Sequence, residues 1–316
     1  MTDKKVIAVV GATGAQGGGL VRAILADPAG GFAVRAITRD PRSAAGQALA
    51  AAGAEVVAGD VDDLDSLTRA FAGAYGAYCV TFFWAHFSPD KEQAQAKNMA
   101  DAAVAAGVQH VVWSTLEDTR KWMAKGDNRM PTLMGKYKVP HFDAKGESDH
   151  FFTDAGVPTT FLLASFYWEN LIGFGAGPKR DADGVLQFTL PIGDAPMAGI
   201  ASDDIGRCAY GIFQRGTSLV GARIGVAGEH LTGAEMAVAM ASAIGQPVHY
   251  NAVTPAVYRA FGFPGAEDLG NMFQFYRDFE PDVNATREVA RSRSLNPALQ
   301  SFETWLAANA SRIPLE

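Results

Sequence analysis

The sequence predicts a doubly wound α/β domain, in which helices cover both faces of a parallel sheet, followed by a smaller α+β region. Three observations lead to this prediction. Short β-branched runs alternate with Ala-rich helical patterns through the first half of the chain, and a glycine-rich turn follows the first run directly. After about Ala164 the alternation stops, and turn residues are mixed with single short apolar runs.

The expected strands are the runs VIAVV, VRAIT, EVVAG, AYCVTFF, HVVWST and TTFLLAS, which occupy residues 6–10, 34–38, 55–59, 77–83, 110–115 and 159–165. The expected helices between and after them span residues 17–28, 43–53, 63–74, 92–107 and 146–156. Strand and helix units that follow one another in this way leave few alternatives to a doubly wound sheet.

The predicted boundary between the two regions lies at residue 164. Residues 1–164 form the first domain, completed by parts of 198–228, and residues 165–316 form the smaller region. In the second region, residues 202–216 and 228–245 predict helices, with Ser202 and Thr232 as N-caps and Glu235 completing a capping box. The tail, residues 296–310, predicts one more amphipathic helix.

Composition and charge exclude several classes of protein. The formal net charge is −7, and no cluster of Lys and Arg is visible, so direct binding to nucleic acid is not expected. No stretch approaches the ~20 continuous apolar residues of a membrane span, which favours a cytoplasmic protein. The two cysteines, Cys79 and Cys208, cannot build a disulfide framework and are expected to be buried thiols. The 6 histidines are scattered, and no metal site is predicted.

The loop GATGAQGG after the first strand predicts a phosphate-binding turn. Gly11 permits the tight turn, Gly14 lets the backbone approach a pyrophosphate, and Gly17 allows close packing of helix on strand. The N–H groups at the start of the next helix then face the phosphates. Because this glycine loop lies between a strand and a helix, it predicts a Rossmann-type domain that binds a dinucleotide.

The end of the second strand indicates which dinucleotide binds. NAD-binding versions place an acidic residue there for the ribose 2′-hydroxyl, whereas this chain has Thr38 and Arg39. A guanidinium suits a 2′-phosphate, so NADP(H) is favoured over NAD, with Arg42 as a second cation. The alternative is that Arg39 is a solvated loop residue and that Asp40 takes the acidic role.

Several segments together resemble the NmrA-like family of atypical short-chain dehydrogenases/reductases. They are GATGAQGG, TRDPR, GAEVVAGDVDD, HFDAKGE, GVPTTFLLASFYWENL, FGFPGAEDLGNMFQFY and SFETWLAAN. The resemblance runs nearly end to end and is greatest to the HSCARG-type NADPH-sensor branch. The family contains redox-sensing regulators as well as NADPH-dependent reductases of quinones and dyes.

The resemblance implies a set of cofactor contacts. It places Gly11, Ala12, Thr13, Gly14, Ala15, Gln16 and Gly17 at the pyrophosphate, Arg39 at the 2′-phosphate and Asp63 near the adenine. Thr81, Phe82 and Phe83 would line the cofactor, and Lys145 would reach the nicotinamide ribose. Tyr167, Trp168, Glu169 and Asn170 would close over the nicotinamide. For the aromatic side chains among these, packing in the core is an equally good interpretation.

The chain departs from its relatives in two places. Near Ala94, sensor-branch members tend to carry a cofactor-facing lysine, and the nearest lysine here is Lys97. The segment RKWMAKGDNRMPTLMGKYKVP before His141 is longer than expected, basic, and punctuated by Gly and Pro. It is interpreted as a mobile surface loop, with a lid over the nicotinamide as the alternative.

Catalytic chemistry is open at the sequence level. Catalytic short-chain reductases use a Tyr-x-x-x-Lys pair, and His141 stands four residues before Lys145 in place of the tyrosine. The family's serine position is matched by Ser114 or Thr115. His141 is therefore a candidate proton donor with Lys145 and Ser114 as its partners, and packing or capping is the alternative role.

Two functions remain in competition. The first is an NADP(H)-binding redox sensor whose loops respond to the cofactor and are read by a protein partner, which fits the missing tyrosine. The second is an NADPH-dependent reductase that passes hydride to a quinone or similar small electrophile. A Rossmann relic without a ligand is a weaker third alternative, and the sequence leaves a homodimer open.

Overall fold

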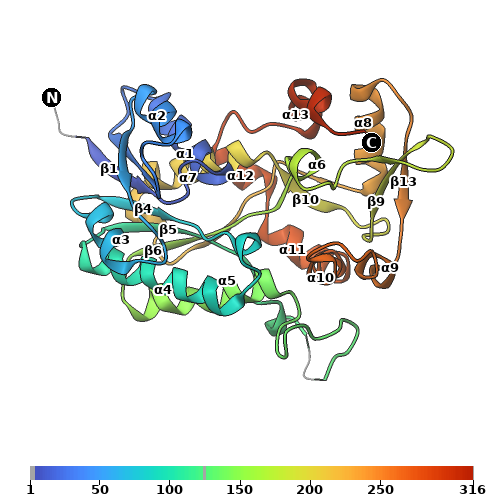
Figure 1. Ribbon diagram of the computed structural model, residues 1–316, viewed down its shortest axis with the longest axis horizontal. Coiled ribbons are helices and arrows are strands. Elements are labelled where there is room, and N and C mark those ends of the chain that lie inside the picture. The colour runs from blue at the N-terminus through green and yellow to red at the C-terminus, as the bar shows by residue number, and fades with distance from the viewer. Residues whose placement is uncertain (1–3, 124–125, 316) are drawn as a thin grey trace. The chain divides into compact units, whose positions relative to one another are not determined.

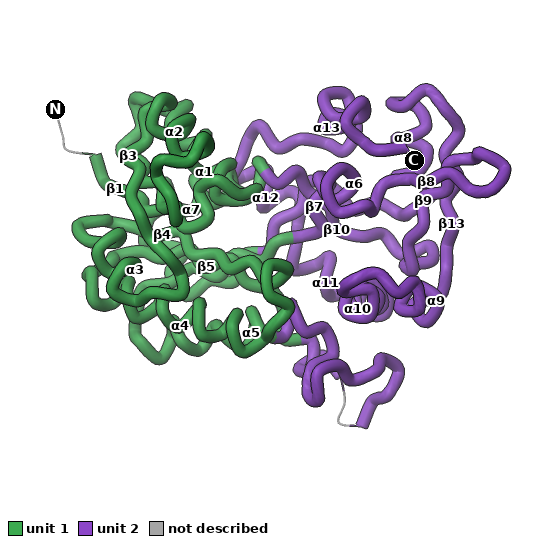
Figure 2. The backbone as a smooth tube through the Cα atoms, viewed as in Figure 1, with its two compact units in different colours: residues 1–118, 144–164, 203–224 green, residues 119–143, 165–202, 225–316 purple. Residues whose placement is uncertain are grey.

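The computed structural model describes residues 4–123 and 126–315, and the chain divides into two compact units (Figure 2). Unit 1 contains residues 1–118, 144–164 and 203–224, and unit 2 contains residues 119–143, 165–202 and 225–316. Residues 119–143, which the sequence analysis assigned to the first domain, thus group with unit 2.

Unit 1 is built on a seven-stranded sheet with the strand order β11-β6-β5-β4-β1-β2-β3 (Figure 1). The neighbouring pairs from β6 to β3 are all parallel. The chain leaves β1 toward β2 and β3 and returns on the other side of β1 as β4, so the switch point of the topology lies between β1 and β4. The strands are β1 (Lys5–Val9), β2 (Phe32–Thr38), β3 (Glu55–Ala58), β4 (Gly76–Cys79), β5 (His110–Thr115), β6 (Thr159–Leu163) and β11 (Arg223–Gly225).

Helices flank this sheet, which confirms the predicted α/β class. They are α1 (Ala15–Leu25), α2 (Ala44–Ala51), α3 (Leu64–Phe71), α4 (Pro89–Ala105), most of α5 (Pro140–Asp154) and α7 (Ser202–Arg215), with the short 3-10 turns η1 (Phe83–Ala85) and η3 (Gly216–Leu219). Side chains of Ser43, Asp63 and Ser88 accept backbone N–H bonds and so begin α2, α3 and α4.

The core of unit 1 contains the buried faces of α3, α4 and α5 against the sheet. Trp113 of β5 stacks on Phe152 of α5 with ring centroids 4.9 Å apart, and Leu67, Phe71 and Met99 belong to the same buried cluster. Helices α4 and α5 lie side by side (Figure 1), joined by a 2.8 Å hydrogen bond from Gln93 to Glu147. This packing brings the first turn of α4 and the first half of α5 to the end of β4.

Helices α1 and α7 approach each other at glycine residues. A Cβ added to Gly206 would lie 2.1 Å from the backbone nitrogen of Leu20, and one added to Gly19 would lie 2.8 Å from the carbonyl oxygen of Asp203. Because backbone atoms stand at both positions, only glycine allows this contact. Residues 203–224 therefore pack into unit 1 although they follow it late in the chain.

Several element boundaries differ from the sequence expectation. The helices predicted at 228–245 and 296–310 begin only at Gly233 and Phe302, and residues 229–231 form a strand. Two further differences bear on the candidate site. The predicted strand 77–83 ends at Cys79, and residues 83–85 form a 3-10 turn instead. The helix predicted at 146–156 already begins at Pro140, because the carboxylate of Asp143 accepts the N–H groups of Lys138 (2.7 Å) and Val139 (3.1 Å) just before the helix. As a result His141 and Lys145 lie one turn apart on α5.

Unit 2 contains two three-stranded sheets, with the orders β12-β10-β7 and β13-β9-β8, and several short helices. The strands are β7 (Phe166–Tyr167), β8 (Lys179–Arg180), β9 (Leu186–Leu190), β10 (Met197–Ile200), β12 (Glu229–Leu231) and β13 (Val248–Ala252). The helices are η2 (Thr119–Lys121), α6 (Asn170–Gly173), α8 (Gly233–Ile244), α9 (Pro255–Arg259), α10 (Ala266–Asp278), α11 (Glu280–Thr286), α12 (Val289–Leu295), α13 (Phe302–Asn309) and η4 (Ala310–Arg312). The capping box predicted at Thr232 and Glu235 is present at the start of α8. Unit 2 therefore mixes short strands and helices, as was expected of the α+β region.

Neither cysteine is in a disulfide; Cys79 and Cys208 are both buried thiols, as predicted, and burial raises the pKa of each. Within residues 4–123 and 126–315, none of the helices combines the length and apolar character that crossing a membrane requires.

A buried histidine in unit 1 predicts that the folded protein loses stability at acidic pH. His110 of β5 is fully buried, its Nε2 lies 2.9 Å from Thr160 Oγ1, and its Nδ1 has no hydrogen-bond partner in the described chain. Burial disfavours the charged ring and lowers the pKa of His110 from 6.5 to about 4. Below pH 6.5 the unfolded chain binds this proton and the folded chain does not, so stability falls as the pH drops toward 4, by about 3 kcal/mol in all.

We expect His110→Gln to remove this part of the pH dependence. Urea unfolding of both proteins at several pH values between 4 and 7 measures it: the free energy of unfolding should fall less steeply with decreasing pH in the variant. Parallel curves for the two proteins would contradict the assignment to His110.

Candidate functional site

The glycine loop between β1 and α1 has the geometry of an anion-binding turn. Gly11 has φ +67°, and the N–H of Gly14 donates to its carbonyl oxygen at 2.8 Å. Gly14 is the N-cap of α1 and has no side chain with which to cap it. Thr13, Gly14 and Ala15 are exposed. The N-terminal end of α1, at Gly14 and Ala15, is therefore open to solvent, as a phosphate site requires.

Gly17 is needed for the shape of this loop. A Cβ on Gly17 would lie 2.4 Å from the carbonyl oxygen of Gly11 and 2.9 Å from that of Val10. Both atoms belong to the backbone of the turn, so a side chain at this position would push the turn away from α1.

Gln16 fastens the loop to the ends of two strands. Its Oε1 accepts hydrogen bonds from Ser114 Oγ of β5 at 2.8 Å and from the hydroxyl of Tyr78 of β4. All three side chains are buried. Ser114, predicted as a catalytic residue, thus contacts the glycine loop through Gln16, and its catalytic role remains a prediction.

Arg39 follows directly after β2, which ends at Thr38, and its side chain is exposed. The neighbouring carboxylate is already used locally: Asp40 Oδ1 accepts the N–H of Arg42 at 2.9 Å, and the Arg42 guanidinium lies 3.7 Å from it. This arrangement turns Asp40 toward its own backbone, and Arg39 and Arg42 are both exposed cations of the loop.

Asp63 has a clear local role. It is the N-cap of α3, and its Oδ1 accepts the N–H of Ser66 at 3.1 Å. Its predicted position near an adenine remains a prediction. Lys97, the nearest lysine to the position where relatives carry a cofactor-facing one, pairs with Asp101 at 2.5 Å on the exposed side of α4.

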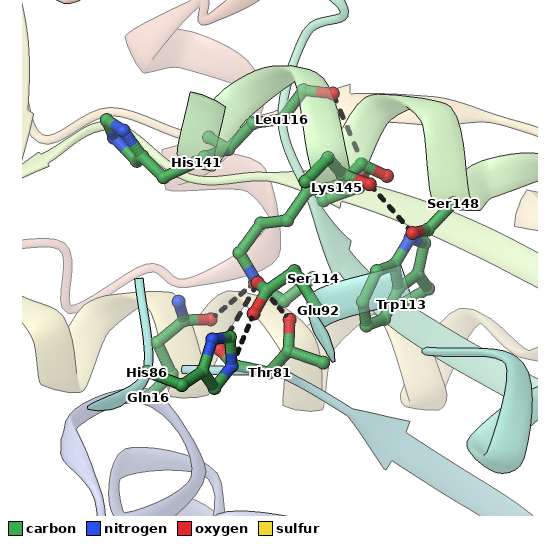
Figure 3. A network of polar contacts seen from close by, with 12 residues as sticks. Gln16, Thr81, His86, Glu92, Trp113, Ser114, Leu116, His141, Lys145 and Ser148 are labelled. Carbon is green, nitrogen blue, oxygen red and sulfur yellow. Dashed lines mark hydrogen bonds and ion pairs between the residues drawn. The ribbon is translucent and has the colours of Figure 1, made fainter. Parts of the chain in front are cut away.

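Lys145 is the centre of a buried polar cluster beyond the end of β4 (Figure 3). Its ammonium donates to the carbonyl oxygen of Thr81 at 3.1 Å and to the Thr81 hydroxyl, and lies 2.9 Å from Glu92 Oε1. The Thr81 hydroxyl in turn donates to Glu92 Oε1 at 2.5 Å. An ammonium has three N–H groups, and these three acceptors account for all of them.

Glu92 carries the negative charge of this cluster. It lies in the first turn of α4 with 0% of its side chain exposed. Burial by itself raises the pKa of a carboxyl group, but the Lys145 charge, with the polar contacts to His86, Thr81 and Lys145, outweighs it and lowers the pKa of Glu92 to about 2. Unit 1 therefore contains an ion pair that is almost completely withdrawn from water.

Aromatic side chains surround the turn after β4. Phe82 is 57% exposed and Phe87 39% exposed, whereas Phe83 is buried between Trp84, His86 and Phe87. Phe87 has φ +52°, a left-handed conformation that is rare for a bulky residue and that clusters at turns and functional sites. Phe83 thus packs in the core, while Phe82 is available to a ligand.

His141 forms a buried pair with an acidic residue of α10. Its Nδ1 lies 2.6 Å from Asp268 Oδ1, and its backbone N–H donates to Asp268 Oδ2 at 3.1 Å. Both side chains are more than nine-tenths buried. This contact gives His141 a structural role in unit 2, and its catalytic role remains a prediction.

The segment before His141 is held by the same helix. Asn271 of α10 donates to the carbonyl oxygens of Pro131 (3.0 Å) and Lys138 (2.5 Å), and Gln274 donates to that of Arg129 (2.8 Å). Asp268, Asn271 and Gln274 recur at helical spacing, so one face of α10 binds residues 129–141. Residues 129–141 of this segment therefore contact α10, and the mobility expected for the segment remains a prediction; residues 124–125 lie outside the described chain.

The run from Tyr167 to Asn170 lies in unit 2 at β7 and the start of α6. Trp168 is buried against Phe302 and Trp305, with centroids 5.3 and 6.2 Å away. Glu169 accepts bonds from the Trp305 indole (3.0 Å) and the Ser202 N–H (2.8 Å). Trp168 and Glu169 therefore stabilise unit 2, and contacts of this run with a cofactor remain a prediction.

Three residues of these clusters were missed in the sequence: Glu92, His86 and Asp268. Each is an ordinary residue in a helix or turn. Glu92 and Asp268 gain their importance from partners 53 and 127 residues away, Lys145 and His141, and His86 gains its importance through Glu92. Nothing in their local sequence signals these contacts.

A parallel sheet with a glycine turn at the end of β1 defines a Rossmann-type α/β protein. The chain belongs to the NmrA-like family, whose model matches residues 3–306.

Individual relatives are consistent with this assignment. The chain is 34% identical over 286 residues to the NmrA-like family domain-containing oxidoreductase FrzB of Cladobotryum sp, which covers 85% of this chain and 83% of the relative. Among solved structures, it superposes on the negative transcriptional regulator NmrA in complex with NADP (TM-score 0.77, 24% identity, 98% and 96% of the two chains). It also superposes on the Citrobacter sp. triphenylmethane reductase complexed with NADP(H) (TM-score 0.73, 19% identity, 97% and 99%). These likenesses to solved structures are likenesses of fold.

Proposed function

We propose that this chain binds NADP(H) through unit 1 and acts as a redox sensor that responds to the ratio of NADPH to NADP⁺. The glycine loop fits the pyrophosphate, because Gly11 takes the left-handed conformation and the first turn of α1 is uncapped. The exposed Arg39 suits the 2′-phosphate. Sequence relatives called oxidoreductases and fold neighbours crystallised with NADP support the proposal.

The observation that carries the sensor proposal is that the ammonium group of Lys145 already uses all of its hydrogen-bond donors. Its three N–H groups are used by two atoms of Thr81 and by Glu92. Lys145 can donate to a nicotinamide ribose only if it gives up one of these acceptors. Binding therefore alters contacts of the turn after β4 and of α4, and a ligand that favours one of two such arrangements shifts their populations.

The resemblance to the HSCARG-type branch supports the same proposal. In this interpretation a protein partner recognises the cofactor-dependent conformation of the loops that carry Arg39 and Phe82. A cytoplasmic location and a homodimer remain predictions.

A reductase is the second candidate, favoured by the aromatic side chains at the end of β4. Phe82 is 57% exposed beside the Lys145 cluster, and a flat acceptor such as a quinone could stack on its ring. Bound NADPH would supply the hydride, and an acceptor of this kind needs little proton donation from the protein. Under this alternative, Lys145 would hold the ribose and Ser114 would keep the loop in place through Gln16.

Titration of the purified protein with NADPH, NADP⁺ and NADH, followed by NADPH consumption against a panel of quinones and dyes, tests both candidates. Tight NADPH binding without turnover, together with a partner affinity or oligomeric state that changes on binding, supports the sensor. Acceptor-dependent oxidation supports the reductase instead. Failure to bind any of the three nucleotides contradicts both.

Arg39→Ala is expected to weaken NADPH binding by about tenfold to a hundredfold, because one charged contact to the 2′-phosphate is lost. NADH, which lacks that phosphate, should bind the variant and the wild type almost equally. Arg42→Ala is the matched control with a smaller effect, since Arg42 already contacts Asp40. Equal losses for both nucleotides would remove Arg39 from the 2′-phosphate site.

A further inference from the structure

A second titratable residue, His86, faces the carboxylate that holds Lys145 (Figure 3). His86 Nε2 lies 3.4 Å from Glu92 Oε2, and its side chain is 11% exposed. Both atoms are buried, and apart from this long contact neither has a hydrogen-bond partner among the described residues. A long contact between two buried polar atoms leaves room for a closer, charged pairing in a second state of the protein.

The contact at the other ring nitrogen fixes where the proton of His86 lies. His86 Nδ1 accepts the N–H of Ser88 at 3.1 Å, so this nitrogen carries no proton. The neutral ring must then have its N–H at Nε2, which points to Glu92 Oε2. In this arrangement Lys145 supplies the charge that balances Glu92, and the N–H of the His86 ring faces the other carboxylate oxygen.

Charged groups from three elements act on His86. Glu92 faces it from α4, and Lys145 of α5 lies on the other oxygen of Glu92. Asp62, in the loop before α3, is close enough for a charged His86 to lower its pKa, and Lys91 pairs with Asp62 at 3.0 Å. The surroundings of His86 are therefore acidic once Lys145 turns away, and an acidic environment favours a protonated imidazole.

We propose that His86 takes up a proton when NADP(H) draws Lys145 away from Glu92, so that cofactor binding and protonation of His86 are coupled. This inference rests on the proposed binding of the nicotinamide ribose by Lys145. A proton from solvent adds to Nδ1, the N–H at Nε2 stays in place, and the imidazolium replaces the ammonium as the partner of the Glu92 carboxylate. The buried carboxylate is thus paired in both states, as a charge so far from water requires.

Protonation has a structural consequence at the start of α4. A protonated Nδ1 cannot accept the Ser88 N–H, so this bond breaks. Ser88 is the N-cap of α4 and belongs to the turn that carries Phe82 and Phe87, both exposed. Protonation of His86 therefore links binding of the cofactor to a change in the turn with Phe82 and Phe87, a surface that a partner can contact.

Calorimetric titration with NADPH in buffers of different ionisation enthalpy measures the protons taken up on binding. We expect wild-type protein to take up about half a proton to one proton more than His86→Gln near pH 7, and its NADPH affinity to rise more steeply as the pH falls. The 2′-phosphate of NADPH also titrates, but its contribution cancels in this difference. His150→Gln, on the exposed side of α5, is the matched control and should behave as wild type.

Equal proton uptake by wild type and His86→Gln overturns the coupling, even where NADPH binds tightly, because the proton would then go to another group such as Glu92. Absence of NADPH binding overturns the coupling and the proposed function together.

A measurement without cofactor also tests whether His86 replaces Lys145 as the partner of Glu92. In Lys145→Met the carboxylate of Glu92 has lost its cation, as it would in the bound state. NMR titration of the histidine side chains, with His86 assigned by its absence in His86→Gln, should place its protonation midpoint about one pH unit or more above wild type. Lys97→Met, which breaks an exposed pair on α4, should leave it unchanged. An unchanged midpoint in Lys145→Met contradicts the proposal.

Discussion

Gly17→Ala is expected to reduce NADPH affinity at least about a hundredfold. The new methyl group would lie 2.4 Å from the carbonyl oxygen of Gly11 and 2.7 Å from its carbonyl carbon. Neither atom can move without opening the turn, and an overpacked site of this kind costs about 3 kcal/mol, which corresponds to about two orders of magnitude in affinity. Fluorescence titration with NADPH measures the loss.

The matched control is Gly31→Ala in the loop before β2. A Cβ at Gly31 would meet nothing within 4 Å, so this variant should bind NADPH as wild type does. Urea unfolding of both variants separates a local change of the loop from a loss of fold. If Gly17→Ala binds NADPH normally while it remains folded, the glycine loop is not the pyrophosphate site.

The features that sequence predicted well depend on local chemistry. The turn at Gly11 and the packing at Gly17 are consequences of a missing Cβ, which is visible in the sequence. The alternation of strands and helices likewise reflects burial along each element, and it led to the observed sheet. The position of Arg39 after β2 follows from this topology.

The polar clusters could not be predicted because they join distant segments. Glu92 reads as a solvated residue of an Ala-rich helix, yet it is buried because α5 brings Lys145 against it. The sequence placed His141 four residues before Lys145 by spacing alone, and the structure adds that Asp268 of α10 contacts its ring. The spacing of residues along a helix predicts which of them share a face, but only the tertiary structure shows which distant residue contacts that face.

The end of β4 also differs from the prediction because of a tertiary contact. The run AYCVTFF is apolar and β-branched enough to predict a strand to residue 83, but the strand ends at Cys79. Beyond it, the backbone and hydroxyl of Thr81 turn to Lys145 instead of to a neighbouring strand. A tertiary ion pair thus overrides the local preference for a strand.

The largest effect on stability is expected at the Lys145 and Glu92 pair. Lys145→Met leaves the Glu92 carboxylate buried without its cation, and Glu92→Leu leaves the ammonium without its anion. Each single variant should lower the free energy of unfolding by about 3 to 5 kcal/mol. The double variant replaces the pair by apolar groups and should recover a large part of the loss, so that the two changes are strongly non-additive.

Urea unfolding of the four proteins measures this coupling, and the exposed pair of Lys97 and Asp101 on α4 supplies the control. Its side chains are 54% and 37% exposed, so Lys97→Met and Asp101→Leu should each change stability by only about 0.5 kcal/mol or less.

The pH dependence of the free energy of unfolding adds an independent check. Because the pKa of Glu92 lies at about 2 in the folded chain and near 4.5 when unfolded, the pair stabilises fully above pH 4.5 and loses this contribution as the pH falls toward 2. Additive losses at Lys145 and Glu92 would mean that the two charges are balanced by other groups, and the exchange of partners inferred for cofactor binding would lose its basis.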